Sequence, residues 1–128
     1  MPYTLIRNSL PAELHHYLER YGEGRNIEIS EPDFERYTAE LSPFTKSVLK
    51  ATCKIPFGQT VTYKQLARLM NRDSAVRAVA SALGRNPLPI VVPCHRVVAT
   101  NGIGGYAFGI DLKKSLLEFE RDFIKSRL

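Results

Sequence analysis

The 128-residue sequence has few of the residues that build disulfide frameworks and metal sites. Its two cysteines, Cys53 and Cys94, are too few to hold together a small secreted fold. Its three histidines, His15, His16 and His95, form no closed zinc pattern with them. We therefore expect no metal and no cofactor. A thiol that must stay reduced fits a cytoplasmic protein.

Long hydrophobic runs are also missing. No stretch approaches the roughly 18 apolar residues of a membrane-spanning helix. Residues 1–10 lack the cationic start and apolar core of a signal peptide. With 44% hydrophobic residues, the chain can still bury a core of ordinary size. These features predict a globular protein of one domain, or of one domain with a short appendage.

Acidic residues are scarce in the middle of the chain. Residues 1–40 contain 4 basic and 8 acidic residues, whereas residues 41–110 contain 9 basic residues and the single acid Asp73. Residues 111–128 have a net charge of +1, so the overall charge of +5 originates in the middle segment. A solvated basic face usually interleaves acids, and this imbalance instead favours a polyanionic partner, above all nucleic acid.

The most unusual stretch runs from Asn86 to Val98, where Cys94 and His95 follow a proline-rich apolar run. Prolines fix their own φ and disfavour helix in the residue before them, so we expect an extended, buried approach to Cys94. The neighbouring histidine and arginine would favour a lowered thiol pKa. Taken alone, the pair allows two interpretations, a small core cysteine or a reactive nucleophile.

Periodicity and capping signals predict alternating short helices and strands. In chain order we expect a strand at Tyr3–Ile6, a helix from Ser9 to Tyr21, a strand at Asn26–Ser30, a short helix at Pro32–Tyr37, a helix from Ser42 to Ile55, a helix from Thr62, a helix from Ser74 to Gly84, a strand at Val97–Thr100 and a last helix capped by Asp111.

Two of these helices form a helix-turn-helix candidate. The first opens with Thr62 and Gln65 at the spacing of a capping box. The outer face of the second carries Arg77, Ala78 and Ser81. Small residues beside a cation would let this helix lie close against a nucleic-acid groove, although they would also suit an ordinary exposed helix.

Glu120 is anomalous within the last helix. It lies at the edge of the apolar face that Leu116 and Phe123 form, where a carboxylate is costly unless it is paired. An arginine could pair with it as a structural salt bridge, or His95 could. The spacing leaves both alternatives open.

Together these residues resemble the active-site domain of the O6-alkylguanine-DNA alkyltransferases, also called methylguanine-DNA methyltransferases. The resemblance covers residues 41–120 and rests on three motifs, which are IPFGQTVTY at 55–63, AVRAV at 75–79, and NP at 86–87 continuing to PCHRV at 93–97. It implies an α+β fold. Residues 41–128 would form a mainly helical, winged-helix-like DNA-binding domain with a helix-turn-helix, and residues 1–40 a short, reduced amino-terminal α/β segment.

The resemblance implies DNA repair by direct reversal. The alkyl group on O6 of guanine, and less efficiently on O4 of thymine, would move irreversibly to the protein's own cysteine, so that each molecule acts once. By matching positions, Cys94 is the acceptor, His95 is its base through a water molecule, and Glu120 orients His95. Asn86 would support the turn beside the site. Tyr63 would donate a proton toward N3 of the departing guanine.

The same resemblance implies a DNA surface and a base pocket. Main-chain groups at Val97 and in the loop at Tyr106 and Ala107, together with Tyr63, would hold the flipped base, and Arg77 would fill the gap left in the duplex. The remaining candidates for contact with the minor groove and its phosphates are Ala78, Ser81, Lys64, Arg72, Arg85 and Arg96. The expected partner is double-stranded DNA containing alkylated guanine, bound by a monomer in the cytoplasm, or at the nucleoid of a prokaryote.

Two departures from the family pattern stand out. Ala107 occupies a position where the family usually has serine, which removes a hydroxyl and keeps the main-chain N–H. Only about forty residues precede the shared region, fewer than in the family's usual amino-terminal domain, so no zinc is expected there. Two other functions fit parts of the sequence. One is an alkyltransferase-like protein that binds lesions without transfer, against which Cys94 argues; the other is a helix-turn-helix regulator that senses alkylation through Cys94.

Overall fold

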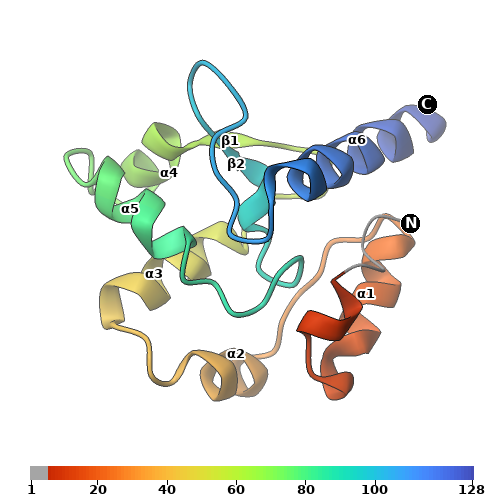
Figure 1. Ribbon diagram of the computed structural model, residues 1–128, viewed down its shortest axis with the longest axis horizontal. Helices are drawn as coiled ribbons and strands as arrows, with labels where there is room; N and C mark the ends of the chain where they lie inside the picture. The colour runs from red at the N-terminus through yellow and green to blue at the C-terminus, as the bar shows by residue number, and fades with distance from the viewer. Residues whose placement is uncertain (1–5) are drawn as a thin grey trace.

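The computed structural model describes residues 6–128, and mainly consists of short helices around a very small sheet (Figure 1). The elements in order are the 3-10 turns η2 (Arg7–Ser9) and η3 (Ala12–Leu14), α1 (His15–Gly22), α2 (Glu31–Thr38), α3 (Pro43–Thr52), β1 (Val61–Thr62), α4 (Tyr63–Leu69), α5 (Val76–Leu83), the 3-10 turn η4 (Cys94–Arg96), β2 (Val97–Val98) and α6 (Ile110–Ser126). Figure 1 shows the sheet between the group of α3, α4 and α5 on one side and α6 on the other. This arrangement confirms a mainly helical α+β fold.

The predicted starts of α3 and α4 are confirmed in detail, whereas the helix predicted from Ser74 begins two residues later, at Val76. The Ser42 hydroxyl accepts a hydrogen bond from Thr45 N–H at 3.1 Å, with Pro43 in the first turn of α3. Thr62 and Gln65 form both bonds of a capping box, so α4 begins directly at Tyr63. Local sequence therefore fixes where the first helix of the helix-turn-helix pair begins.

The helix-turn-helix pair rests on α3. The buried face of α5 is formed by Val79, Ala82 and Leu83, and α5 contacts both α3 and α4. The turn between α4 and α5 includes Asn71 at a φ of 57°, a conformation that asparagine adopts more readily than most residues. This packing leaves the opposite face of α5 in solvent.

A two-stranded parallel sheet joins the helix-turn-helix pair to the Cys94 segment. Val61 of β1 pairs with Val97 of β2, and Thr62 pairs with Val98. The sequence did not predict β1, because a strand of two residues carries no periodic pattern. Its pairing places Tyr63, the first residue of α4, beside the turn that contains Cys94.

Three expectations for the amino-terminal segment meet different outcomes. The helix predicted from Ser9 begins as two 3-10 turns and becomes α-helical at His15. The strand predicted at Asn26–Ser30 is wrong, because these residues are coil and pair with no strand among residues 6–128, and Ile27 and Ile29 pack against the core. Most of the strand predicted at Tyr3–Ile6 lies outside the described residues.

The start of the last helix also differs from expectation. Gly109, at a φ of 106°, precedes α6 and occupies the cap position without a side-chain bond. Asp111 lies one residue inside the first turn, where its charge still complements the helix dipole. No helix within residues 6–128 is long and apolar enough to cross a membrane.

One continuous core connects the amino-terminal segment to the rest of the molecule. Leu18 and Tyr21 of α1 belong to the same buried cluster as Val48 of α3, Leu66 of α4 and Leu116 of α6. The end of α1 therefore lies against the elements that carry the Cys94 segment.

Candidate active site

Two tight turns lead the chain into Cys94. The first turn is centred on Ile90, where Val91 N–H donates to the Pro89 carbonyl at 2.8 Å. Ile90 has a φ of 69°, so this is a γ-turn that is strained for a β-branched residue. Around Pro93, with φ −81° and ψ 59°, Cys94 N–H donates to the Val92 carbonyl in an inverse γ-turn. The predicted burial of this run is confirmed, but its predicted extended conformation is wrong, because the chain doubles back.

Asn86 holds this doubled-back segment together from inside. Its Nδ2 donates to the Val92 carbonyl at 3.0 Å and to Sγ of Cys94 at 3.1 Å, while its Oδ1 accepts from Leu88 N–H at 2.9 Å. The Asn86 side chain is buried, so each bond replaces a hydrogen bond to water. One amide thereby fixes the turn and contacts the thiol.

Cys94 is only 5% exposed, and this burial decides its protonation. Desolvation raises the pKa of the Cys94 thiol to about 11, although the hydrogen bond from Asn86 and the charge of Lys113 oppose part of the increase. The lowered thiol pKa expected from the neighbouring residues is therefore wrong. Because the resting group is a neutral thiol, a base must remove its proton before Cys94 can act as a nucleophile.

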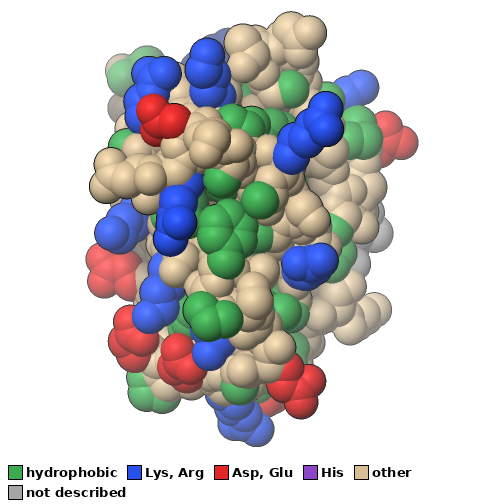
Figure 2. Space-filling model, turned by 90° about the vertical axis from the view of Figure 1, so that its left-hand side faces the viewer, with side chains coloured by type: hydrophobic (Ala, Val, Ile, Leu, Met, Phe, Trp, Pro, Cys, Tyr) green, Lys and Arg blue, Asp and Glu red, His purple; other side chains and the backbone are tan. Residues whose placement is uncertain are grey.

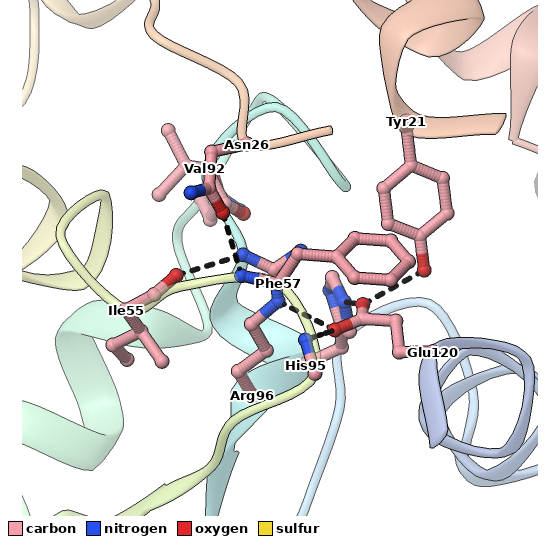
Figure 3. A network of polar contacts seen from close by, with 10 residues as sticks. Tyr21, Asn26, Ile55, Phe57, Val92, His95, Arg96 and Glu120 are labelled. Carbon is pink, nitrogen blue, oxygen red and sulfur yellow. Dashed lines mark hydrogen bonds and ion pairs between the residues drawn. The ribbon is translucent and has the colours of Figure 1, made fainter. Parts of the chain in front are cut away.

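Glu120 accepts hydrogen bonds from four groups that come from distant parts of the chain (Figure 3). Its Oε2 contacts Nε2 of His95 at 2.5 Å and accepts from the Tyr21 hydroxyl at 2.8 Å. Its Oε1 accepts from Nε of Arg96 and from the Gly58 main-chain N–H, each at 2.8 Å. The sequence left open whether an arginine or His95 pairs with Glu120, and in the structure Arg96 and His95 both do.

This network assigns the protons on His95. Burial alone would raise the pKa of Glu120, but its bonds to His95 and Arg96 outweigh burial and lower the pKa to about 2. An ionised carboxylate only accepts hydrogen bonds, so Nε2 of His95 carries the hydrogen. Burial lowers the pKa of His95, which leaves a neutral ring with an unprotonated Nδ1. That Nδ1 is buried and has no hydrogen-bond partner among residues 6–128.

Cys94 opens onto a pocket of about 370 Å³. Its lining comes from α4, α5, the Cys94 turn and the loop before α6, and consists of Tyr63, Ala80, Leu83, Gly84, Cys94, Gly105, Tyr106 and Ala107. Most of these side chains are apolar or small, as in a site for a flat ring with few polar contacts. The structure thus brings Cys94, Tyr63, Tyr106 and Ala107 together around one cavity.

The two tyrosines of the pocket have different surroundings. The Tyr63 hydroxyl accepts from Gly105 N–H at 3.1 Å, so it is tied to the loop before α6. Gly104 lies beneath it at a φ of 75°, and a Cβ there would come within 2.7 Å of the Tyr63 oxygen. The Tyr106 hydroxyl is buried and has no hydrogen-bond partner among the described residues.

The outward face of the helix-turn-helix pair is basic and free of ion pairs. Arg77, Ala78 and Ser81 of α5 are exposed, as the sequence predicted. The other exposed cations of this region are Lys64, Arg68, Arg72 and Arg85, and like Arg77 they form no salt bridge within residues 6–128. Figure 2 shows Lys and Arg side chains distributed over this side of the molecule around a hydrophobic centre, with most visible acidic side chains toward the lower end.

Comparison with known proteins agrees with this geometry. The model of the "6-O-methylguanine DNA methyltransferase, DNA binding domain" family matches residues 43–122. A methylated-DNA–protein-cysteine methyltransferase of Saccharolobus islandicus is 45% identical over 108 residues, which cover 84% of this chain and 68% of the relative. The enzyme of that name from Methanocaldococcus vulcanius is 50% identical over 96 residues, which cover 75% of this chain and 57% of the relative.

The chain belongs to the 6-O-methylguanine DNA methyltransferase family.

Solved structures of the family share its fold. The crystal structure of Mycobacterium tuberculosis OGT in complex with DNA superposes with a TM-score of 0.69 at 34% identity, covering 84% of this chain and 65% of that one. Atl1 of S. pombe, in complex with damaged DNA containing O6-carboxymethylguanine, matches with a TM-score of 0.53 at 27% identity, covering 72% and 79%. The chain thus spans somewhat less than two thirds of the OGT structure that it resembles.

Arg96 of the family motif does not lie where we expected. It was predicted to contact DNA, but it is only 4% exposed. Besides its bond to Glu120, it donates from a terminal nitrogen to the Ile55 carbonyl at 2.8 Å, and its guanidinium lies over the Phe57 ring. The predicted DNA contact of Arg96 is therefore wrong, because the side chain is buried and its guanidinium is bonded within the core.

Lys113 of α6 was missed by the sequence analysis. Its Nζ donates to the Val97 carbonyl at 2.6 Å and to the Gly105 carbonyl at 2.8 Å, and lies over the Tyr63 ring. Desolvation lowers the pKa of Lys113 to about 8. The Val97 carbonyl, expected to hold a base, is thus already bonded once, with a second lone pair left. Lysines on amphipathic helices are ordinarily solvated. The only signal in the sequence is the position of Lys113 one turn before Leu116, on the buried face of α6.

Proposed function

We propose that this chain repairs alkylated DNA by transferring the alkyl group from O6 of guanine to Sγ of Cys94. The observation that carries the proposal is the position of Cys94, which opens onto the pocket while its neighbour His95 is bonded to the ionised Glu120. The names of relatives at 45% and 50% identity support the same reaction.

The reaction balances with groups that the chain supplies. The thiol proton leaves toward the unprotonated Nδ1 of His95 through a water molecule, and Glu120 stabilises the resulting imidazolium. The thiolate attacks the alkyl carbon, an S–C bond forms, and the bond from that carbon to O6 breaks. The electron pair remains on guanine, and Tyr63 donates a proton toward N3, so that the guanine is released as a neutral base. The proton taken up by His95 then passes through solvent to the Tyr63 phenolate, which restores both side chains. Asn86 keeps Sγ in place through its 3.1 Å contact.

The product is a thioether, which explains why each molecule acts once. A carbon–sulfur bond of this kind is not cleaved by a histidine base or a neighbouring amide, so Cys94 is consumed. We propose that O4 of alkylated thymine reacts less efficiently at the same site. A thiol that must stay reduced until it reacts supports a cytoplasmic location.

The DNA surface is proposed to be the exposed face of α5 and its surroundings. Arg77 would fill the space left by the flipped nucleotide, while Ala78 and Ser81 allow close approach to the minor groove. Lys64, Arg72 and Arg85 would bind phosphates. Tyr106, Ala107 and main-chain groups near Val97 would hold the base in the pocket.

Two organisational proposals accompany this function. We propose that the chain binds DNA as a monomer. We also propose that the chain consists of an amino-terminal segment at residues 1–40 and an active-site and DNA-binding domain at residues 41–128. This division is a prediction, and the shared core across it is compatible with a short segment that serves the larger domain.

The direct test is mass analysis after incubation with an oligonucleotide containing O6-methylguanine. We expect the peptide with Cys94 to gain the mass of one CH₂ group, while the peptide with Cys53 stays unmodified. Cys53 is a matched internal control, because burial also raises its pKa to about 11 and its neighbours in the sequence are Thr52 and Lys54, not a histidine. A Cys94→Ala variant should bind the oligonucleotide and show no transfer.

Other outcomes would favour the competing functions. Tight lesion binding by native, reduced protein without any mass gain would indicate an alkyltransferase-like binding protein. Sequence-specific binding of unmodified DNA that changes after alkylation of Cys94 would indicate a regulator. Loss of folding in Cys94→Ala would point to a core cysteine instead.

A further inference from the structure

Tyr21 is an unexpected member of the Glu120 network. It comes from α1, about a hundred residues before Glu120 in sequence, and lies outside every motif of the family resemblance. Its hydroxyl donates to Oε2 of Glu120 at 2.8 Å, the same oxygen that His95 contacts. In the sequence this residue reads as part of an ordinary apolar helix stripe, and only the structure shows what its hydroxyl contacts.

The surroundings of Tyr21 hold its hydroxyl in one place. The residue is fully buried, and its ring packs against Phe57 and Phe119 and meets the His95 ring edge-on at 6.1 Å between centroids. Figure 3 shows the side chain reaching from the end of α1 down to the Glu120 carboxylate. Tyr21 therefore contacts both the carboxylate and the imidazole of the proposed relay.

The chain just after Tyr21 is anchored to the same region. Asn26 Oδ1 accepts from Phe57 N–H at 2.8 Å, and Arg127 donates to the Gly24 carbonyl at 2.6 Å. Gly24 has a φ of 71° and lies so close to Phe123 that a Cβ would come within 2.3 Å of its ring. A glycine is thus required where α1 ends, and the turn keeps Tyr21 over Glu120.

Two donors on one carboxylate oxygen compete for the same charge. The Tyr21 hydroxyl partly neutralises Oε2, so this oxygen attracts the Nε2–H of His95 less strongly than a free carboxylate would. A weaker attraction stabilises the imidazolium less and favours the neutral ring.

We propose that Tyr21 is a positioning residue for alkyl transfer, by which the amino-terminal segment sets the geometry and basicity of His95 through Glu120. The inference rests on the proposed function, since it assigns His95 as the base. With Tyr21 in place, His95 stays neutral and able to accept the Cys94 proton at mildly acidic pH. Without the hydroxyl, the pKa of His95 is higher. As the pH falls, His95 is then protonated sooner and can no longer accept the Cys94 proton.

The test compares Tyr21→Phe with Tyr17→Phe. Tyr17 is a matched control, because it lies on the same helix, is buried, and donates its hydroxyl at 2.7 Å to a carboxylate outside the network, that of Asp33. Transfer from free O6-benzylguanine is measured across the pH range, so that DNA binding does not enter. The His95 imidazole is followed in parallel by NMR titration.

We expect Tyr21→Phe to move the acidic limb of the rate profile, and the His95 titration with it, upward by about half a unit to one unit. Tyr17→Phe should leave both where they are in the native protein. If Tyr21→Phe lowers the transfer rate by the same factor at every pH and leaves the His95 titration unchanged, the role of Tyr21 is only structural. An equal displacement in Tyr17→Phe would also overturn the proposal. If native protein transfers no alkyl group, the proposed function fails, and the NMR titration still decides whether Tyr21 acts on His95.

Discussion

At the scale of single residues, Glu120 joins the most distant parts of the site. Its two oxygens accept from Tyr21, His95, Arg96 and the Gly58 main chain, and its side chain is 1% exposed. A buried carboxylate with all its acceptor sites filled stays ionised, which in turn determines the tautomer of His95. The chemistry of Cys94 thus depends on a residue of a different helix.

The pKa of Glu120 leads to a stability prediction. Its folded pKa of about 2 lies below the ordinary 4.5, so its stabilising contribution is complete above about pH 4.5 and is lost as the pH falls toward 2. We expect Glu120→Gln to lower the free energy of unfolding at neutral pH by about 3 kcal/mol, and the difference from native protein to shrink as the pH falls through this range. Urea unfolding at several pH values measures both curves.

Glu118→Gln is the matched control for this experiment, because Glu118 lies on the exposed face of the same helix. It should change the unfolding free energy by less than about 0.5 kcal/mol at any pH. A difference between native protein and Glu120→Gln that stays constant from neutral to acidic pH would contradict the assigned network.

At the scale of elements, Lys113 connects α6 to β2 and to the loop that lines the pocket. Its Nζ satisfies the carbonyls of Val97 and Gly105 in a buried position. We expect Lys113→Met to lower the free energy of unfolding by about 2–4 kcal/mol, because the buried Val97 carbonyl and the partly buried Gly105 carbonyl lose their donor. The exposed neighbour provides the control, since Lys114→Met should cost less than about 0.5 kcal/mol in the same denaturation measurement. Equal effects of the two substitutions would mean that the Lys113 contacts contribute nothing.

A second prediction at this scale concerns α5. Arg77→Ala should slow repair in duplex DNA by about tenfold or more, because nothing then fills the space of the flipped nucleotide. Its reaction with free O6-benzylguanine should stay close to that of the native protein. Single-turnover rates on the two substrates measure the ratio, with Arg121→Ala on the exposed side of α6 as control. Equal losses on both substrates would exclude a flipping role for Arg77.

The elements that could be predicted from sequence are those with local signals. The Thr62 and Gln65 capping box fixed the start of α4 because both bonds are made within one turn. Strand β1 could not be found, since its partner is distant and its length is two residues. Arg96 was wrongly assigned to the DNA surface and Lys113 was missed for a related reason, because the sequence does not show which charged side chains are buried. Tyr21 could not be placed at the site because its only signal was a hydrophobic stripe.

At the scale of the whole molecule, charge is divided between two regions. The basic segment at residues 41–110 includes the exposed side of the helix-turn-helix pair, where Figure 2 shows many Lys and Arg side chains. The acidic residues concentrate in residues 1–40. Several amino-terminal acids pair with cations at their border with the basic segment, as Glu35 does with Lys46 and Glu31 with Lys50. The exposed cations of the helix-turn-helix pair, by contrast, form no ion pair within residues 6–128.

This division predicts the salt dependence of DNA binding. If Lys64, Arg72 and Arg85 each neutralise one phosphate, the logarithm of the association constant should fall with the logarithm of salt concentration at a slope of about −3. Lys64→Gln should reduce this slope by about 1, whereas Lys125→Gln on exposed α6 should not alter it. Fluorescence anisotropy over a salt series measures the slope. A flat response would exclude this face as the DNA surface.

The stoichiometry of repair tests the central claim most directly. Protein is mixed with an excess of duplex DNA containing O6-methylguanine, and restored guanine is quantified until the reaction stops, together with the methyl group on Cys94. The account predicts a plateau at one guanine restored per native protein, matched by one methyl group on Cys94. Restoration that continues beyond one equivalent, or that leaves Cys94 unmodified, would contradict it.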